Sequence, residues 1–145
     1  REVPAHAYYG VHSLRALENF PITRTAISIY PDLVVALACV KQAAAIANSE
    51  LGLLDEPRAQ AIRRACEDVR AGKLLEEFVV DVIQGGAGTS TNMNANEVLC
   101  NRALEILGHA KGEYRHLHPL DHVCLNRELT ESRHAVFPRA KYLLN

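Results

Sequence analysis

The sequence has little of what proteins that bind nucleic acids or membrane surfaces usually carry. It contains no tryptophan, aromatic residues make up 6%, and the formal net charge is −1. Base stacking needs aromatic faces and phosphate binding needs clustered cations, so we expect no nucleic acid and no membrane surface as partner. No run reaches the roughly 18 unbroken apolar residues of a membrane span, because Lys41 and Gln42 interrupt the longest candidate, residues 33–47.

Paired cysteines and cofactor motifs are also missing. No two of the four cysteines form a CxxC pair, so neither a zinc knuckle nor a redox motif is indicated. We therefore expect free thiols, buried where they fall in helices, and a reducing cytoplasmic location. We expect no metal, nucleotide or other cofactor, and the N-terminus shows no apolar signal-peptide core. The cysteines are Cys39, Cys66, Cys100 and Cys124.

The remaining pattern predicts one mainly α domain, since 145 residues with 48% hydrophobic residues support a single core. Residues 1–32 contain three prolines and predict an extended N-terminal arm, with a short strand at residues 26–30. Asp32 is the expected N-cap of a helix over residues 33–51, and Asp55 with Pro57 opens a second helix that ends at Gly72. A third helix is predicted over residues 92–107. Residues 74–83 predict a short helix that gives way to a strand, residues 109–132 an irregular polar segment, and residues 135–144 a restarted helix.

One segment carries a chemical signal. Residues 84–98 read QGGAGTSTNMNANEV, in which glycines precede three hydroxyl residues and the predicted start of a helix. Hydroxyls, backbone N–H groups and a helix N-terminus together favour an anion, either phosphate or carboxylate. The spacing fits neither a P-loop nor a dinucleotide-binding turn. On spacing alone, a simple capping loop in which Thr91 or Asn92 only caps the helix explains the segment equally well.

The string GGAGTSTNMNANEV resembles the first conserved block of the aspartase/fumarase superfamily, in wording closer to aspartases than to fumarases. Two further stretches resemble the same family. Residues 7–20, AYYGVHSLRALENF, are similar to the N-terminal block of aspartases, and residues 111–123, KGEYRHLHPLDHV, to the segment that leads into the second block. The resemblance covers residues 1–123 almost continuously, and a match along one long string is far more specific than a short motif.

The resemblance implies a fold and a reaction. Members of the family are largely helical homotetramers whose active sites combine residues from three subunits. Aspartases eliminate ammonia from L-aspartate to give fumarate, reversibly, through an intermediate with extra negative charge on a carboxylate. Preorganised hydroxyls and amides stabilise such charge. The expected partner is therefore a small dicarboxylate, aspartate or fumarate.

The resemblance also carries site residues onto this sequence. Thr89 matches the substrate-binding threonine of the family block, and His118 matches a histidine near the active-site entrance. A surface loop histidine is an equally good reading of His118. The full predicted substrate-binding set is Thr89, Ser90, Thr91, Asn92, Asn94 and His118. No catalytic residue is expected in this chain.

The resemblance stops at residue 124. Residues 124–134 read CLNRELTESRH, where the family has a carboxylate-binding Ser-[ST]-Asn block, and no later G-S-S-x-M-P-x-K loop with the family's base occurs. We therefore expect an N-terminal lyase-like domain over residues 1–123 and a divergent tail over residues 124–145. The start of the central helical domain is one reading of that tail. A disturbed reading frame over residues 124–134 is one explanation. The catalytic parts are absent, so the chain alone is expected to be inactive. The alternatives are a fumarase-type hydratase fragment, or a non-catalytic protein that binds an anion or associates with full-length subunits.

Overall fold

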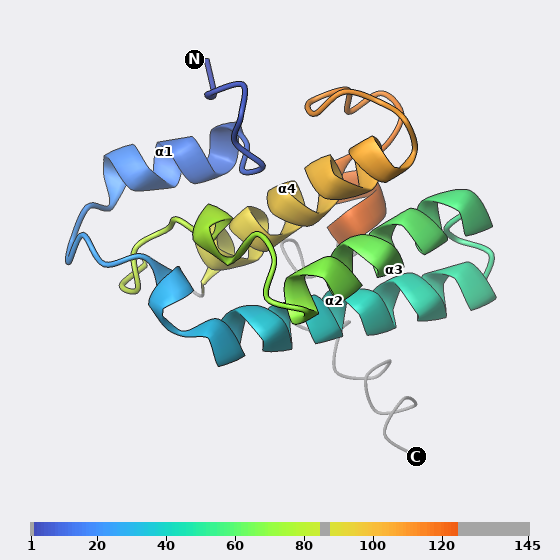
Figure 1. Ribbon diagram of the computed structural model, residues 1–145, viewed down its shortest axis with the longest axis horizontal. Coiled ribbons are helices and arrows are strands. Elements are labelled where there is room, and N and C mark those ends of the chain that lie inside the picture. The colour runs from blue at the N-terminus through green and yellow to red at the C-terminus, as the bar shows by residue number, and fades with distance from the viewer. Residues whose placement is uncertain (1, 85–87, 125–145) are drawn as a thin grey trace.

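Four α-helices make up most of the computed structural model, which describes residues 2–84 and 88–124. They are α1 (Val11–Asn19), α2 (Pro31–Glu50), α3 (Glu56–Arg70) and α4 (Thr89–Ile106). Helix α4 runs through the middle, with α1 on one side and the α2–α3 hairpin on the other (Figure 1). The described residues form no strand and only one isolated β-bridge, between Ala26 and Asp81. The predicted mainly α fold class is confirmed.

The hairpin of α2 and α3 forms much as its sequence predicts. The Asp55 side chain accepts a hydrogen bond from Arg58 N at 3.2 Å, which satisfies a free N–H group at the start of α3. Gly52 and Gly72 follow the two helices with φ angles of 71° and 86°, in the left-handed region where glycine carries no steric penalty. The predicted cap at Asp32 is wrong. Helix α2 begins at Pro31, so Asp32 lies inside its first turn.

Helix α4 is the centre of the hydrophobic core. Most of its residues from Met93 to Leu104 are buried, and they pack against α3 and the loops on either side. A helix buried around most of its surface has no polar face for solvent. The largest fully buried apolar side chains of the described residues are Phe78, Ile62, Leu99, Leu104 and Leu117.

The prediction of an extended N-terminal arm over residues 1–32 is only partly correct, because residues 11–19 form helix α1. Its local sequence provides no side-chain cap at Gly10. The cap comes instead from Glu97 of α4, whose carboxylate accepts hydrogen bonds from the N–H groups of His12 and Ser13 at 2.9 and 3.0 Å. A capping group 84 positions away along the chain leaves no local signal.

The short strands expected around residues 26–30 and at the end of residues 74–83 are also wrong. Residues Ile27–Ile29 form a single 3₁₀ turn, η1. The short helix expected at the start of residues 74–83 is a 3₁₀ turn over Leu75–Glu77, η2, and the residues that follow it make only the isolated bridge at Asp81. Residues 25–27 and 80–82 still exchange backbone hydrogen bonds, from Ile27 N to Val80 O at 2.9 Å and from Val82 N to Thr25 O at 2.9 Å. This pairing is too brief to continue as a sheet.

The cysteines and the C-terminal segment complete the comparison. All four cysteines are free, and three of them are buried, but Cys39 on α2 is exposed. The segment predicted as irregular contains a short π-helix, η3 (Pro119–Cys124). Of the tail predicted over residues 124–145, residues 125–145 lie outside the described residues, the restarted helix included, as do the loop residues 85–87.

Helix α2 keeps an apolar surface of its own. By length and composition alone it is long and apolar enough to cross a membrane, with a mean hydropathy of 1.3 and 22% of the window buried. One such helix is weak evidence, because core helices of soluble proteins have the same properties. Val40 is 65% exposed, Leu33 43% and Ile46 37%, so one side of α2 packs against nothing in the described residues.

Candidate functional site

The hydroxyl-rich segment forms the first turn of α4 rather than the loop before it. Gly88 is the N-cap, with φ 79° in the left-handed region, and Thr89, Ser90 and Thr91 follow as the first helical residues. Thr89 is exposed, and Ser90 and Thr91 are half-buried. No side chain of the described residues caps this end and no acidic residue lies in its first turn. The free N–H groups and the positive end of the helix dipole therefore remain available to an anion.

A buried lysine lies directly behind this helix start. Lys41 of α2 is 6% exposed, and its Nζ donates a hydrogen bond of 2.6 Å to Oδ1 of Asn92. The amide nitrogen of Asn92 lies 3.9 Å from Sγ of Cys124 in η3. Asn92 thus links α2, α4 and η3, with its carbonyl oxygen turned toward the ammonium group.

Burial lowers the pKa of Lys41 below its usual 10.5, because the charged form loses its water. Nearby thiolates at Cys124 and Cys66 would act in the opposite direction. Burial raises the pKa of the Cys66 thiol to about 12, so that group is neutral at physiological pH and offers the lysine no counter-charge. A buried cation with only an amide partner is costly, and an anion at the start of α4 would relieve that cost.

The second half of the motif has a different role. Asn94, Glu97 and Asn101 follow one another at helical spacing on α4, and all are buried. Asn94 donates to Glu77 O at 3.0 Å, and Asn101 donates to Tyr8 O at 2.7 Å. These side chains fasten the loops on both sides of the helix. Asn94 is therefore engaged inside the fold, and its role as a substrate ligand stays a prediction.

Glu97 is the central member of this buried row. Its carboxylate accepts hydrogen bonds from Gly10 N at 2.9 Å and from the Ser13 hydroxyl at 2.6 Å, besides the two N–H groups of α1 described above. Gly10 makes this approach possible. A Cβ atom there would lie 2.6 Å from Oε1 of Glu97 and 2.9 Å from the Tyr114 hydroxyl.

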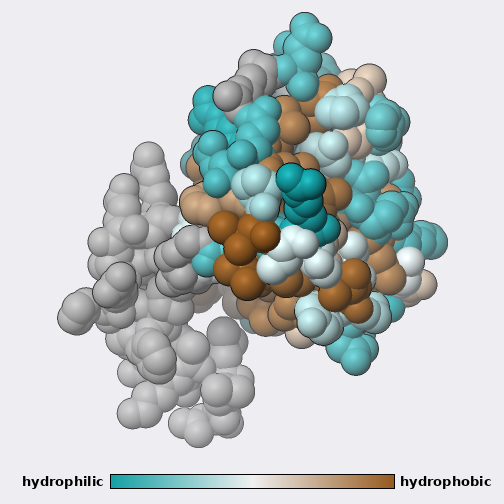
Figure 2. Space-filling view, turned by 90° about the vertical axis from the view of Figure 1, so that its left-hand side faces the viewer, coloured by the Kyte–Doolittle hydropathy of each residue, from teal (hydrophilic) through white to brown (hydrophobic). Residues whose placement is uncertain are grey.

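A second carboxylate, Asp81, orders the end of the molecule where α4 begins. It accepts hydrogen bonds from Thr23 N and Arg24 N at 2.7 Å each and from Ile83 N at 2.8 Å. Its burial opposes ionisation, but these bonds outweigh that effect and hold its pKa below 3.8. Figure 2 shows this end, where hydrophobic side chains gather beside hydrophilic ones. A shallow cavity of about 290 Å³ lies here, lined by Leu17, Phe20, Pro21, Arg24, Ala26, Val79 and Asp81.

His118 lies apart from the hydroxyl-bearing turn. Its Nδ1 accepts hydrogen bonds from Leu120 N and Asp121 N, each at 3.3 Å, at the start of η3. Its ring meets the Tyr114 ring edge-on at 5.8 Å between centroids. The same Nδ1 also lies 3.3 Å from Oδ2 of Asp121. No hydrogen bond or ion pair among the described residues joins His118 to Thr89–Asn92, so its role beside that turn stays a prediction.

The structure therefore brings together Thr89, Ser90, Thr91 and Asn92, and adds Lys41, which the sequence analysis did not select. The signal was present, because Lys41 is the one cation in the apolar stretch of residues 33–47. Glu97 was also missed as a structural anchor. A charged residue on a helix that is otherwise buried was its signal.

A helical domain whose central helix begins with free N–H groups and hydroxyl residues, with a lysine behind them, offers donors and positive charge that suit a small anion. A family model described as "Lyase" matches residues 1–130. The chain therefore belongs to this lyase family.

Individual relatives agree with that assignment. The chain is 57% identical over 139 residues to an aspartate ammonia-lyase of Pseudomonas canavaninivorans, across 96% of this chain. A fumarate lyase:delta crystallin from Brucella melitensis, in a crystal structure bound to cobalt, matches with a TM-score of 0.84 and 56% identity over 85% of this chain and 27% of that one. A class II fumarase from Schistosoma mansoni matches with a TM-score of 0.72 and 36% identity over 83% of this chain and 25% of that one. The resemblance to aspartases is confirmed.

The comparisons also fix how much of a relative this chain represents. It spans 28% of the length of the Pseudomonas enzyme. The matching part is the N-terminal region of these proteins.

Proposed function

We propose that this chain is the N-terminal part of an enzyme that reversibly eliminates ammonia from L-aspartate to give fumarate, and that it supplies a substrate-carboxylate-binding segment. The observation that carries the proposal is the start of α4, where three hydroxyl residues, free N–H groups and buried Lys41 converge. Negative charge that builds up on a carboxylate during elimination is stabilised by such preorganised donors. Thr89, Ser90 and Thr91 are the proposed direct ligands, and Asn92 positions the turn.

Ammonia elimination is preferred over water addition because of the degree of identity. The chain is 57% identical to an aspartate ammonia-lyase but 36% identical to a class II fumarase. The hydroxyl turn alone does not separate the two reactions, since both handle fumarate's carboxylates. The proposed location is the cytoplasm, in keeping with four free cysteines.

The apolar side of α2 supports a homotetrameric assembly for the complete enzyme. Val40 and Leu33 stand on a face that nothing in the described residues covers. Exposed apolar side chains gathered on one face of a helix are typical of an interaction site. In the proposed enzyme, helices that the chain does not include would cover this face within the assembly.

A chimaera tests the proposal. The segment of the Pseudomonas enzyme that aligns with residues 2–124 is replaced by those residues, and fumarate release from aspartate is followed by absorbance. We expect an active tetramer by light scattering, and no fumarate from the purified 145-residue chain alone. A folded, tetrameric chimaera without activity would support the non-catalytic reading, and activity of the isolated chain would contradict the proposed incompleteness.

Replacing Lys41 with methionine in the chimaera should raise KM for aspartate about 10-fold, because the buried positive charge behind the carboxylate is lost. The fold should not be weakened, since methionine fills the same apolar space without a desolvation cost. Gln42→Met, at the neighbouring and more exposed position on α2, is the matched control and should leave KM unchanged.

The pH dependence of stability gives a second measurement on the same variant in the isolated chain. The folded pKa of Lys41 lies below 10.5, so the unfolded state binds more protons between the two values. Lys41 therefore makes the fold more stable as pH rises through that window. The buried thiols have the opposite effect, because their raised pKa values make the fold less stable as pH rises above the ordinary thiol pKa. The informative quantity is therefore the difference in unfolding free energy between parent and Lys41→Met. That difference should favour the variant most at neutral pH and shrink as pH approaches 10.5. A constant difference would show that Lys41 is not held in a costly charged state.

A further inference from the structure

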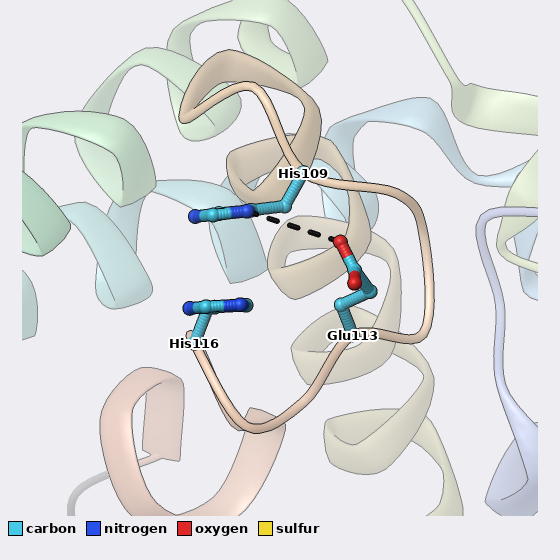
Figure 3. Close-up of side chains that lie close together, drawn as sticks. All are labelled: His109, Glu113 and His116. Carbon is cyan, nitrogen blue, oxygen red and sulfur yellow. Dashed lines mark ion pairs between the residues drawn. The ribbon is translucent and has the colours of Figure 1, made fainter.

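We propose that His109, Glu113 and His116 form a binding site for a divalent transition-metal ion such as Zn²⁺. These residues lie in the segment that follows α4 and take no part in the carboxylate-binding turn. Each offers one ligand atom, and the three atoms lie within 4.8 Å of one another. The side chains converge on one space, with the two imidazole rings face to face (Figure 3).

The backbone holds the three residues in place. Gly108 ends α4 with φ 83°, and the N–H of His109 bonds back to Leu104 O at 2.9 Å. The N–H of His116 donates to Glu113 O at 3.0 Å, which forms the turn that brings the second ring under the first. The carbonyl oxygen of His116 accepts from Nε of Arg58 at 2.7 Å. The loop is thus fixed at both ends, so ion binding needs only side-chain adjustment.

The distance between His109 and Glu113 is close to that between two ligands of one ion, whereas the His109 and His116 rings are stacked and must rotate. Nδ1 of His109 lies 3.8 Å from Oε2 of Glu113, and the two ring centroids are 3.8 Å apart with an interplanar angle of 3°. Ligand atoms at 2.0–2.2 Å from a tetrahedral Zn²⁺ ion are about 3.3–3.5 Å apart. If the distance between Nδ1 of His109 and Oε2 of Glu113 shortens by about half an ångström, both atoms can coordinate one ion, and a rotation of the His116 ring brings its nitrogen to the same ion.

The chemical type of the ligands favours a borderline transition metal over magnesium or calcium. Two imidazoles and one carboxylate suit Zn²⁺ and its neighbours, whereas Mg²⁺ and Ca²⁺ prefer sets composed of oxygen atoms. The His109 and Glu113 side chains are each 33% exposed, so water can complete the coordination. An open fourth position of this kind is typical of zinc sites that exchange ligands.

Arg115 competes for the same atoms. Its Nε donates to Nε2 of His116 at 3.0 Å, and its Nη2 donates to Oε1 of Glu113 at 3.0 Å. The arginine side chain is 76% exposed and can swing into water when an ion arrives. Lys111, a further cation in this segment, is directed away, to His6 O at 2.6 Å and over the Tyr8 ring. Removal of Arg115 should therefore strengthen metal binding rather than weaken it.

Calorimetric titration of the 145-residue chain with Zn²⁺ tests the site, in a Cys39→Ser background that removes the exposed thiol. We expect one ion per chain. His109→Ala and His116→Ala should each weaken binding about 10-fold or more, whereas Arg115→Gln should tighten it. His6→Ala, at an exposed histidine outside the cluster, should leave the affinity unchanged.

Thermal unfolding gives an independent readout, because an ion that binds only the folded state raises Tm. Zn²⁺ should raise Tm of the parent and more so of Arg115→Gln, and should leave His109→Ala and His116→Ala unchanged. Binding that persists in both histidine variants, or an Arg115→Gln variant that binds no tighter than the parent, would overturn the proposal. The comparison of Arg115→Gln with the parent stays informative even if a histidine variant fails to fold.

Discussion

Replacing Thr89 with valine should lower kcat/KM for aspartate about 100-fold in the chimaera, most of it in kcat. Thr89 is the first helical residue of α4 and is exposed, so its hydroxyl is free to reach a carboxylate outside the domain. Valine keeps the shape of threonine and removes the hydroxyl. A donor whose bond strengthens as charge develops affects kcat more than KM.

Two control variants separate this effect from a disturbance of the helix. Thr89→Ser keeps the hydroxyl and should retain most of the activity. Ser49→Ala removes a hydroxyl from the far end of α2, where Ser49 donates to Oε2 of Glu56 at 2.7 Å, and should not affect turnover. If Thr89→Val and Thr89→Ser lose activity equally, the side chain acts through packing and not as a donor to the substrate.

Replacing Glu97 with alanine should destabilise the 145-residue chain by about 3–5 kcal/mol, a large part of the roughly 5–15 kcal/mol that holds a domain folded. The carboxylate accepts hydrogen bonds from three N–H groups and one hydroxyl at the start of α1, and Glu97 is fully buried. Its removal leaves those donors without a partner and opens a cavity beside the core. Urea unfolding followed by far-UV circular dichroism measures the loss.

The same contact is tested from the other side by Gly10→Ala. The added Cβ would lie 2.7 Å from Cδ of Glu97, a side chain that four hydrogen bonds prevent from moving away. We expect this variant to be destabilised in the same direction as Glu97→Ala. Glu67→Ala, which removes an exposed glutamate from α3, is the control and should stay within about 0.5 kcal/mol of the parent. A loss below about 1 kcal/mol for Glu97→Ala would mean that α1 does not depend on this cap.

Local signals were reliable where the helix ends carry their own caps. Asp55 and Pro57 marked the start of α3, and the glycines at 52 and 72 marked two helix ends. Local signals failed where the capping group comes from a distant part of the chain. Helix α1 begins directly after Gly10 because Glu97, 87 positions away, accepts hydrogen bonds from its first N–H groups, and no local window of sequence contains both residues.

The candidate site was predicted in part. The motif identified Thr89, Ser90, Thr91 and Asn92, because hydroxyl and amide residues at a helix start have a known affinity for anions. It did not reveal that the helix begins at Thr89 instead of Asn92, since that start depends on the left-handed conformation of Gly88. Lys41 was read only as an interruption of an apolar stretch. Its proximity to Asn92 arises from the packing of α2 and η3 around the start of α4.

The sequence by itself determined the helical class, through apolar periodicity and capping residues, and the lyase family, through a long motif that chance does not produce. Only the tertiary structure decided what each polar residue of that motif does. Thr89 points outward, whereas Asn94 and Glu97 turn inward and fasten loops, because a helix separates neighbouring residues onto different faces. The histidine cluster after α4 was likewise decided by two turns of the backbone, at Gly108 and Gly112. Such turns bring side chains together, and the order of residues along the chain does not predict where the backbone folds back.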